Sequence, residues 1–170
     1  MIRRISLVFA LCFAALTVFC ACADGSVSDT VDGAMTALTD SAGNVTGYER
    51  RYHNADGQLS RLDMYDSDKT YLNYVLYAYD DYSRLYTETY YRADGIAESR
   101  NVYTYGDDGK LSEKAVESPS GEVTVFCYDS SGEVVEKLYY DSNEKLFRHE
   151  VLSDGVWQNV EIDSSSSDEE

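Results

Sequence analysis

Tyrosine is the residue type in this sequence whose number and spacing could build a binding surface. The segment from residue 77 to residue 95, YAYDDYSRLYTETYYRADG, holds six of the 16 tyrosines in the chain. An aromatic ring can pack against a ligand with its face while its hydroxyl stays in water. The candidate ligand-binding residues are Tyr77, Tyr79, Tyr90, Tyr91, Tyr103 and Tyr105. The alternative is that the same rings form a purely structural ladder within a sheet.

Two acidic segments bear on calcium binding. DSDKTYLN offers Asp66 and Asp68, and DDGKLSE offers Asp107, Asp108 and Glu113. Neither segment carries the full set of ligands of a calcium-binding loop, and aspartates that form turns explain both. We therefore expect no metal site and no cofactor.

Nucleophilic catalysis would require a cysteine or serine close to a base. Cys127, in TVFCYD, is remote in sequence from His53 and His149, and its surroundings are those of a small strand residue. The chain has no zinc-ligand spacing, no glycine-rich nucleotide loop and no serine-nucleophile motif, and nothing singles out a pair among its 31 acidic residues. We expect that the protein is not an enzyme.

The elements that must position the tyrosines are set by regularly spaced turns. Each turn is rich in Asp, Asn or Ser and ends on a position where glycine predominates, because glycine and asparagine tolerate a positive φ. These positions, 11 to 14 residues apart, are Gly43, Gly57, Lys69, Ser83, Gly95, Gly109, Gly121, Gly132, Glu144 and Gly155. The residues between two turns suffice for a strand and are too few for a helix.

Apolar residues recur at fixed distances from these turns. Two positions after the glycine position comes an apolar residue such as Leu59 or Leu85, and four positions before it comes a tyrosine such as Tyr79 or Tyr105. This pattern predicts cross-strand pairs in an all-β, repetitive antiparallel hairpin meander of about ten strands. So many strands curl, which predicts a curled single sheet or an open spiral or barrel. The segment YLNYVLYAY, residues 71–79, is apolar on both parities, which predicts burial on both faces.

A family resemblance rests on these repeats. YAYDDYSRL, YTYGDDGKL, FCYDSSGEV and YYDSNEKL, within residues 60–148, resemble the YD repeat of Rhs-type bacterial proteins, whose pattern is roughly Y-x-Y-D-x-x-G-R-L. The resemblance implies a spiralling β shell and carbohydrate binding, although ten strands are too few to enclose a folded cargo. The units also resemble MORN-like hairpin repeats.

The first 21 residues have the features of a secretory signal: MIRR is basic, and ISLVFALCFAALTVF is apolar but too short to span a membrane. FCAC resembles a bacterial lipobox, and this resemblance makes Cys22 the lipidated residue. The alternative is that ACA is a signal-peptidase site, with cleavage after Ala23 and free secretion. We expect an exported protein with an acidic tether at 22–33, a repeat domain at 34–161 and a disordered acidic tail at 162–170.

Charge restricts the partners. The formal net charge is −17, and it becomes −19 without Arg3 and Arg4. Such a chain repels nucleic acid and anionic surfaces, which leaves a neutral glycan or a protein as partner, with the membrane reached through the lipid anchor. We therefore expect a surface binding or adhesion module that uses its aromatic face. The alternative is a structural or immunity-type protein whose acidic surface binds one cognate protein.

Overall fold

The computed structural model of the protein describes residues 30–31 and 35–162, and all of its regular elements are β-strands. The predicted signal segment, Cys22, Ala23 and nearly all of the acidic tail lie outside the described residues. The strands are β1 (Thr30–Val31), β2 (Thr36–Thr39), β3 (Val45–His53), β4 (Leu59–Asp66), β5 (Tyr71–Tyr79), β6 (Leu85–Arg92), β7 (Ala97–Tyr105), β8 (Leu111–Glu117), β9 (Val123–Tyr128), β10 (Val134–Tyr140), β11 (Leu146–Ser153) and β12 (Val156–Asn159).

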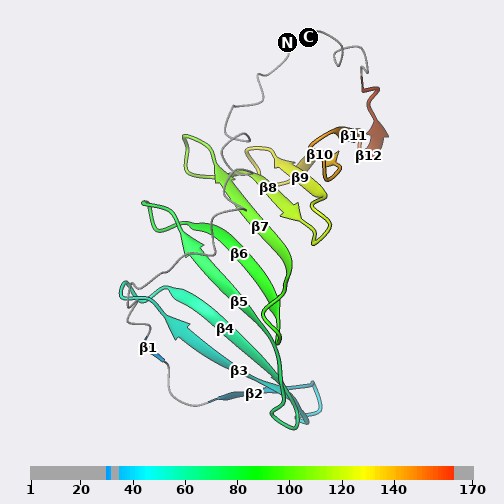
Figure 1. Cartoon of the computed structure of the whole chain (residues 1–170). Helices are drawn as coiled ribbons and strands as arrows, with labels where there is room; N and C mark the ends of the chain where they lie inside the picture. The colour runs from blue at the N-terminus through cyan, green and yellow to red at the C-terminus, as the bar shows by residue number, and fades with distance from the viewer. Residues whose placement is uncertain (1–29, 32–34, 163–170) are drawn as a thin grey trace.

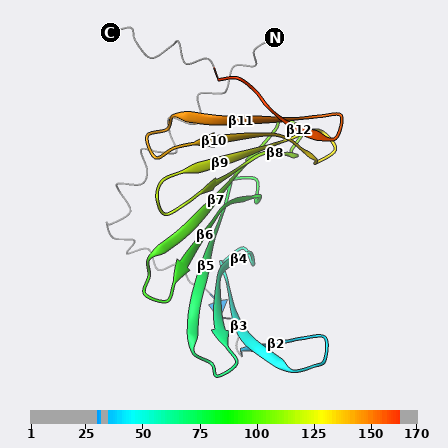
Figure 2. The same cartoon turned by 90° about the vertical axis from the view of Figure 1, so that its right-hand side faces the viewer.

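The twelve strands form one antiparallel meander sheet. From β3 to β12 every strand pairs with its neighbours in sequence, while β1 and β2 both pair with the outer edge of β3. The predicted all-β hairpin meander is therefore confirmed, and the sheet remains open, because β12 does not pair with β1, β2 or β3. Figures 1 and 2 show a strongly twisted and curved single layer.

All ten predicted glycine positions have a positive φ, including the three that carry other residues: Lys69 (φ 64°), Ser83 (64°) and Glu144 (63°). At the first turn the amide of Asp40 donates to the carbonyl of Asn44, and the amide of Gly43 donates to the carbonyl of Asp40, both at 3.0 Å. This arrangement is a hairpin loop whose left-handed residue adjoins a bulge. Turn chemistry therefore sets the position of every strand end.

An acidic or amide side chain holds most of these turns. In the turn after β5, for example, the Oδ1 atom of Asp80 accepts the amides of Tyr82 and Arg84, both at 2.9 Å. Two turns begin with Arg92 or Gly106, whose side chains have no oxygen to accept a hydrogen bond from a backbone amide. There the third turn residue substitutes, and Asp94 accepts the amide of Ile96 at 3.1 Å while Asp108 accepts that of Lys110 at 3.0 Å.

The predicted cross-strand pairs form at the strand ends. Each tyrosine four positions before a glycine position lies directly opposite the residue two positions after it. These pairs are Tyr65 with Tyr71, Tyr79 with Leu85, Tyr91 with Ala97, Tyr105 with Leu111, Tyr128 with Val134, and Tyr140 with Leu146. On the side away from the turn, a register shift separates each of these pairs from the next pair of the ladder, as expected next to a bulged turn.

The sheet has little apolar core because no second layer covers it. Among the described residues, the buried apolar cluster is Val123, Val125 and Leu138, where β8 to β11 curl, and the buried apolar residue outside it is Val75. The expectation that β5 is buried on both faces is wrong: Leu72 and Leu76 are 46% and 37% exposed. A strand with apolar residues at both odd and even positions is buried only where another layer covers each face of the sheet. The described residues form a single sheet and provide no such layer.

Candidate functional site

The six predicted binding tyrosines do not form one platform. Successive residues of a strand point to opposite faces, and residues that pair directly across strands share a face. By these rules Tyr91 lies on one face, which we call the groove face, and the other five lie on the opposite face, which we call the Glu88 face. The reason is that successive turns lie at opposite ends of the strands. Residues at the same distance from successive turns therefore point alternately to the two faces of the sheet.

Three of the five tyrosines gather around Glu88. The hydroxyls of Tyr103 and Tyr90 donate to its Oε2 atom at 2.6 and 3.2 Å, and the side-chain amide of Asn101 donates to the same atom at 2.9 Å. Tyr77 lies directly opposite Glu88. Burial, together with the nearby Glu88 carboxylate, raises the pKa of Tyr77 to about 12 and raises that of Tyr103 further. The hydroxyls of Tyr90 and Tyr103 are occupied within the protein, which favours the structural role for these two residues.

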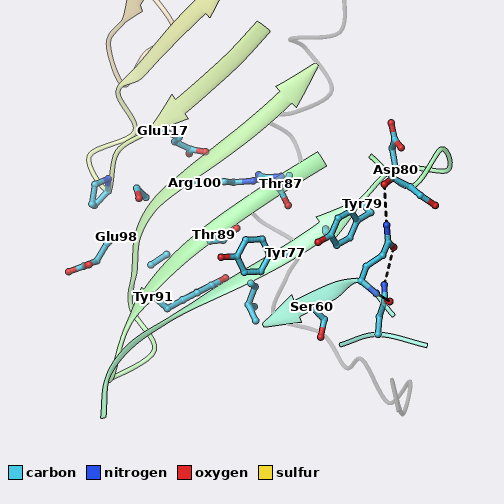
Figure 3. Close-up of a pocket in the computed structure, with 18 of the residues that line it drawn as sticks. Ser60, Tyr77, Tyr79, Asp80, Thr87, Thr89, Tyr91, Glu98, Arg100 and Glu117 are labelled. Atoms are coloured by element: carbon cyan, nitrogen blue, oxygen red, sulfur yellow. Dashed lines mark hydrogen bonds between the residues drawn. The ribbon is translucent and has the colours of Figure 1, made fainter. Parts of the chain in front are cut away.

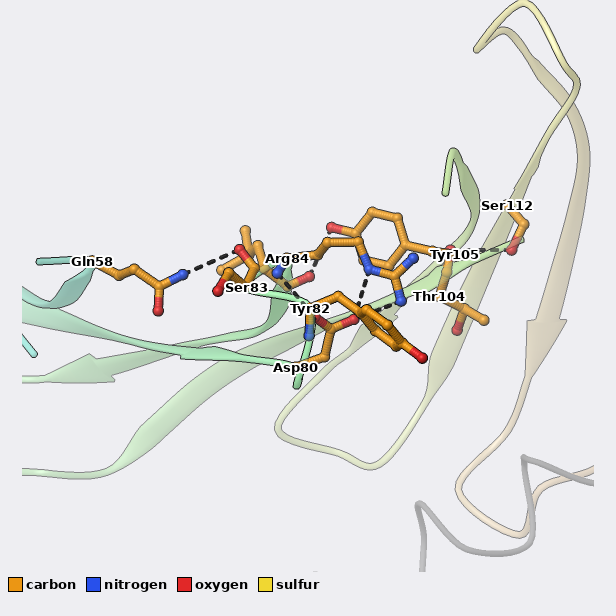
Figure 4. A network of polar contacts seen from close by, with 9 residues as sticks. Gln58, Asp80, Tyr82, Ser83, Arg84, Thr104, Tyr105 and Ser112 are labelled. Atoms are coloured by element: carbon orange, nitrogen blue, oxygen red, sulfur yellow. Dashed lines mark hydrogen bonds and ion pairs between the residues drawn. The ribbon is translucent and has the colours of Figure 1, made fainter. Parts of the chain in front are cut away.

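Tyr79 and Tyr105 satisfy backbone carbonyls at the bulges. Their hydroxyls donate to the carbonyls of Leu59 and Leu85, at 3.0 and 2.8 Å respectively. The bond between Tyr105 and Leu85 belongs to a network of polar contacts at the ends of the strands (Figure 4). There the Arg84 guanidinium binds Asp80 and lies 4.4 Å from the centre of the Tyr105 ring.

A row of stacked side chains crosses the groove face from β3 to β6. The guanidinium of Arg61 lies 5.7 Å from the ring centre of Tyr52 and 4.3 Å from that of Tyr74. The ring of Tyr74 then stacks on that of Tyr91, with centres 4.7 Å apart and planes 6° apart. Asp63, only 4% exposed, fixes Arg61 by accepting its Nε–H at 2.6 Å.

The row ends at Tyr91, because within residues 30–31 and 35–162 Tyr74 is the one ring that stacks on it and no guanidinium or ammonium does. The next residue in the row, directly opposite Tyr91 on β7, is Ala97, which is exposed and has only a methyl group. One face of the Tyr91 ring is held by Tyr74 while the other faces the space above Ala97. A ring fixed in this way is a preorganised stacking surface.

That space is part of an open groove of about 1150 Å³. It runs diagonally across the sheet, from the turns at 54–58 and 80–83 to the turn at 118–121, the direction in which a twisted sheet can be concave. Among the predicted residues, Tyr91 borders it from the groove face, and Tyr77 and Tyr79 also border it although strand register places them on the Glu88 face, whereas Tyr90, Tyr103 and Tyr105 do not border it. Figure 3 shows Tyr91, Thr89 and Arg100 among the residues that line it.

Sequence reasoning missed most of the groove. Its floor includes Leu76, Thr89, Arg100 and Glu117, which lie in one row because each is directly opposite the next on β5 to β8. No motif marks these residues. The only available signal was the strand register, which the turn positions and their bulges set.

Cys127 has the properties of a structural residue. It packs against the cluster of Val123, Val125 and Leu138, and burial, with Glu136 and Glu113 nearby, raises the pKa of its thiol to about 12. The thiolate needed for nucleophilic attack is therefore disfavoured. In the described part of the chain, no three or more His, Cys, Asp or Glu side chains are arranged to hold a metal ion.

Comparison with known proteins adds no identity. The chain matches no protein-family model and no curated protein sequence. A search for membrane-spanning helices through residues 30–31 and 35–162 finds no helix long and apolar enough to cross a bilayer.

Proposed function

We propose that the protein is a binding module that holds a neutral glycan in the open groove, with Tyr91 as its stacking surface. The single observation that carries this proposal is the uncovered ring face of Tyr91 above Ala97, in a groove lined by hydroxyl and charged side chains. An apolar ring face beside a few polar groups is the usual composition of a small-molecule site.

The charges around the groove support an uncharged ligand. Asp56, Asp81 and Glu98 are exposed groove residues, and an anionic chain would be repelled by them. Export, and anchoring through Cys22 or release after Ala23, would bring such a module to external glycans, and we retain both as proposals.

The test is a glycan array probed with the wild-type protein and with matched tyrosine variants. Tyr91→Ala should weaken binding about tenfold, the effect of losing about 1.4 kcal/mol, whereas Tyr91→Phe should retain binding because the ring remains. Tyr82→Ala is the control, since Tyr82 is 79% exposed and does not line the groove. Equal binding by wild-type and Tyr91→Ala protein would refute the role of Tyr91.

The alternative, recognition of a cognate protein by the acidic surface, predicts a different response to salt. Binding driven by a net charge of −17 should weaken steeply with ionic strength, whereas stacking on a neutral sugar should not. A salt-sensitive protein partner together with an absence of glycan binding would favour the alternative.

A further inference from the structure

Two charged side chains lie side by side on the groove floor without pairing. Arg100 on β7 is directly opposite Glu117 on β8, and both are half-buried. Within the described part of the chain, neither side chain forms a hydrogen bond or an ion pair, with the other or with any third residue. Elsewhere on the sheet the partly buried carboxylates Asp63, Glu88 and Glu150 are each bonded to tyrosine hydroxyls. Arg100 and Glu117 are therefore charged floor groups with unused bonding capacity.

Their chemistry specifies the kind of group that they can hold. A guanidinium only donates hydrogen bonds and a carboxylate only accepts them, so the pair matches a ligand that accepts and donates at neighbouring atoms. Adjacent sugar hydroxyls do both. The two charges cancel, so the floor itself favours no net ligand charge, while the acidic rim disfavours anions.

The position of the pair fixes a minimum length for the ligand. Tyr91 lies on β6 with its open side above Ala97 on β7, whereas Glu117 lies on β8, so Tyr91 and Glu117 are two steps between strands apart. Two steps amount to roughly 10 Å. A single sugar ring on Tyr91 cannot also reach Glu117, and the groove continues past Glu117 to Ser118 and Pro119.

We infer that the groove binds a neutral oligosaccharide chain of at least two units, with one sugar stacked on Tyr91 and sugar hydroxyls bonded to Arg100 and Glu117. This inference rests on the proposed function and extends it from a glycan to a chain of defined minimum length and charge. It also assigns Arg100 and Glu117 as specificity-determining residues.

The test uses the full chain on arrays printed with one to six units of glucose, galactose and N-acetylglucosamine, and with uronic acid chains of the same lengths. We expect affinity for the neutral chains to rise from the monosaccharide to at least the disaccharide. Arg100→Gln and Glu117→Gln should each weaken trisaccharide binding about tenfold, because each removes a charge-assisted hydrogen bond. Neither should lower the melting temperature, since neither residue has a partner within the fold.

Matched controls are Lys145→Gln and Glu133→Gln, which make the same charge changes on exposed turns outside the groove. The inference is overturned if monosaccharides bind as tightly as trisaccharides, if uronic acid chains bind best, or if both groove variants bind like wild type. In each of those outcomes glycan binding itself stands. Absence of binding to every chain would overturn this inference and the proposed function together.

Discussion

Replacing with glycine three of the four described non-glycine residues that have a positive φ should stabilise the protein. Lys69, Ser83 and Glu144 have φ values of 63° to 64°, and a side chain in this conformation costs roughly 1–2 kcal/mol. Glycine removes that cost but makes the unfolded chain more flexible, which offsets about 0.5–1 kcal/mol. The net gain is about 0.5–1 kcal/mol per site, so the triple glycine variant should gain about 1.5–3 kcal/mol, since distant sites are additive.

The local contacts rank two of the three sites, Ser83 and Lys69. Ser83 contributes backbone groups: its amide donates to the carbonyl of Asp80 at 2.9 Å, and its carbonyl accepts the side-chain amide of Gln58 at 3.1 Å. Both bonds are retained in Ser83→Gly. Lys69 lies 5.0 Å from the ring centre of Tyr48, so Lys69→Gly also loses a weak cation–π contact. We therefore expect Ser83→Gly to gain more than Lys69→Gly.

Urea unfolding followed by fluorescence and far-UV circular dichroism measures this gain. For a slope of 1–3 kcal/mol/M, a gain of 2 kcal/mol raises the midpoint by about 1 M with the slope unchanged. Ser67→Gly, in the same turn as Lys69 but without a positive φ, is the control and should not stabilise. A triple variant no more stable than wild type would refute the assignment of these positions as strained.

Three further predictions concern buried polar groups. Asp63→Asn should cost about 2 kcal/mol of stability, because the Arg61 guanidinium loses its buried charged partner. The control Asp94→Asn, at the exposed Arg92–Asp94 ion pair of the same spacing, should cost far less. Equal losses of stability in urea unfolding would contradict this. The Cys127 thiol, with its pKa raised to about 12, should react with a disulfide reagent at pH 8 only after unfolding in urea, and rapid reaction of the folded protein would contradict its burial. Because folding raises the pKa of Tyr77 from 10.0 to about 12, the stability that its neutral form provides should be complete below pH 10 and lost as the pH rises to 12; a midpoint of urea unfolding unchanged over this interval would contradict it.

The sequence predicted the repeating local structure well because turn chemistry is local. The spacing of Gly57, Gly95 and their equivalents located every positive φ of the described residues except that of Asp154, including the one at Ser83, and the Tyr79–Leu85 type of pair followed from it. These features depend on residues within a few positions of one another, which a single sequence displays.

The division of the tyrosines between faces could not be predicted in the same way. It depends on which edge each turn closes and on the bulges, so that Tyr91 and Tyr105, equally far from their turns, lie on opposite faces. The adjacency of Arg100 and Glu117 likewise depends on register across a bulged hairpin. Burial of β5 was overestimated because no residue pattern reveals that a second layer is missing.

The central claim is that the groove face, and not the Glu88 face, holds the ligand. NMR titration of the purified protein with a neutral oligosaccharide selected on the array tests this most directly, because it reports each residue separately. We predict that the signals of Thr89, Tyr91, Arg100 and Glu117 shift at saturation, while those of Tyr90 and Tyr103 around Glu88 stay in place. Shifts confined to the Glu88 cluster or to the exposed turns would contradict the account.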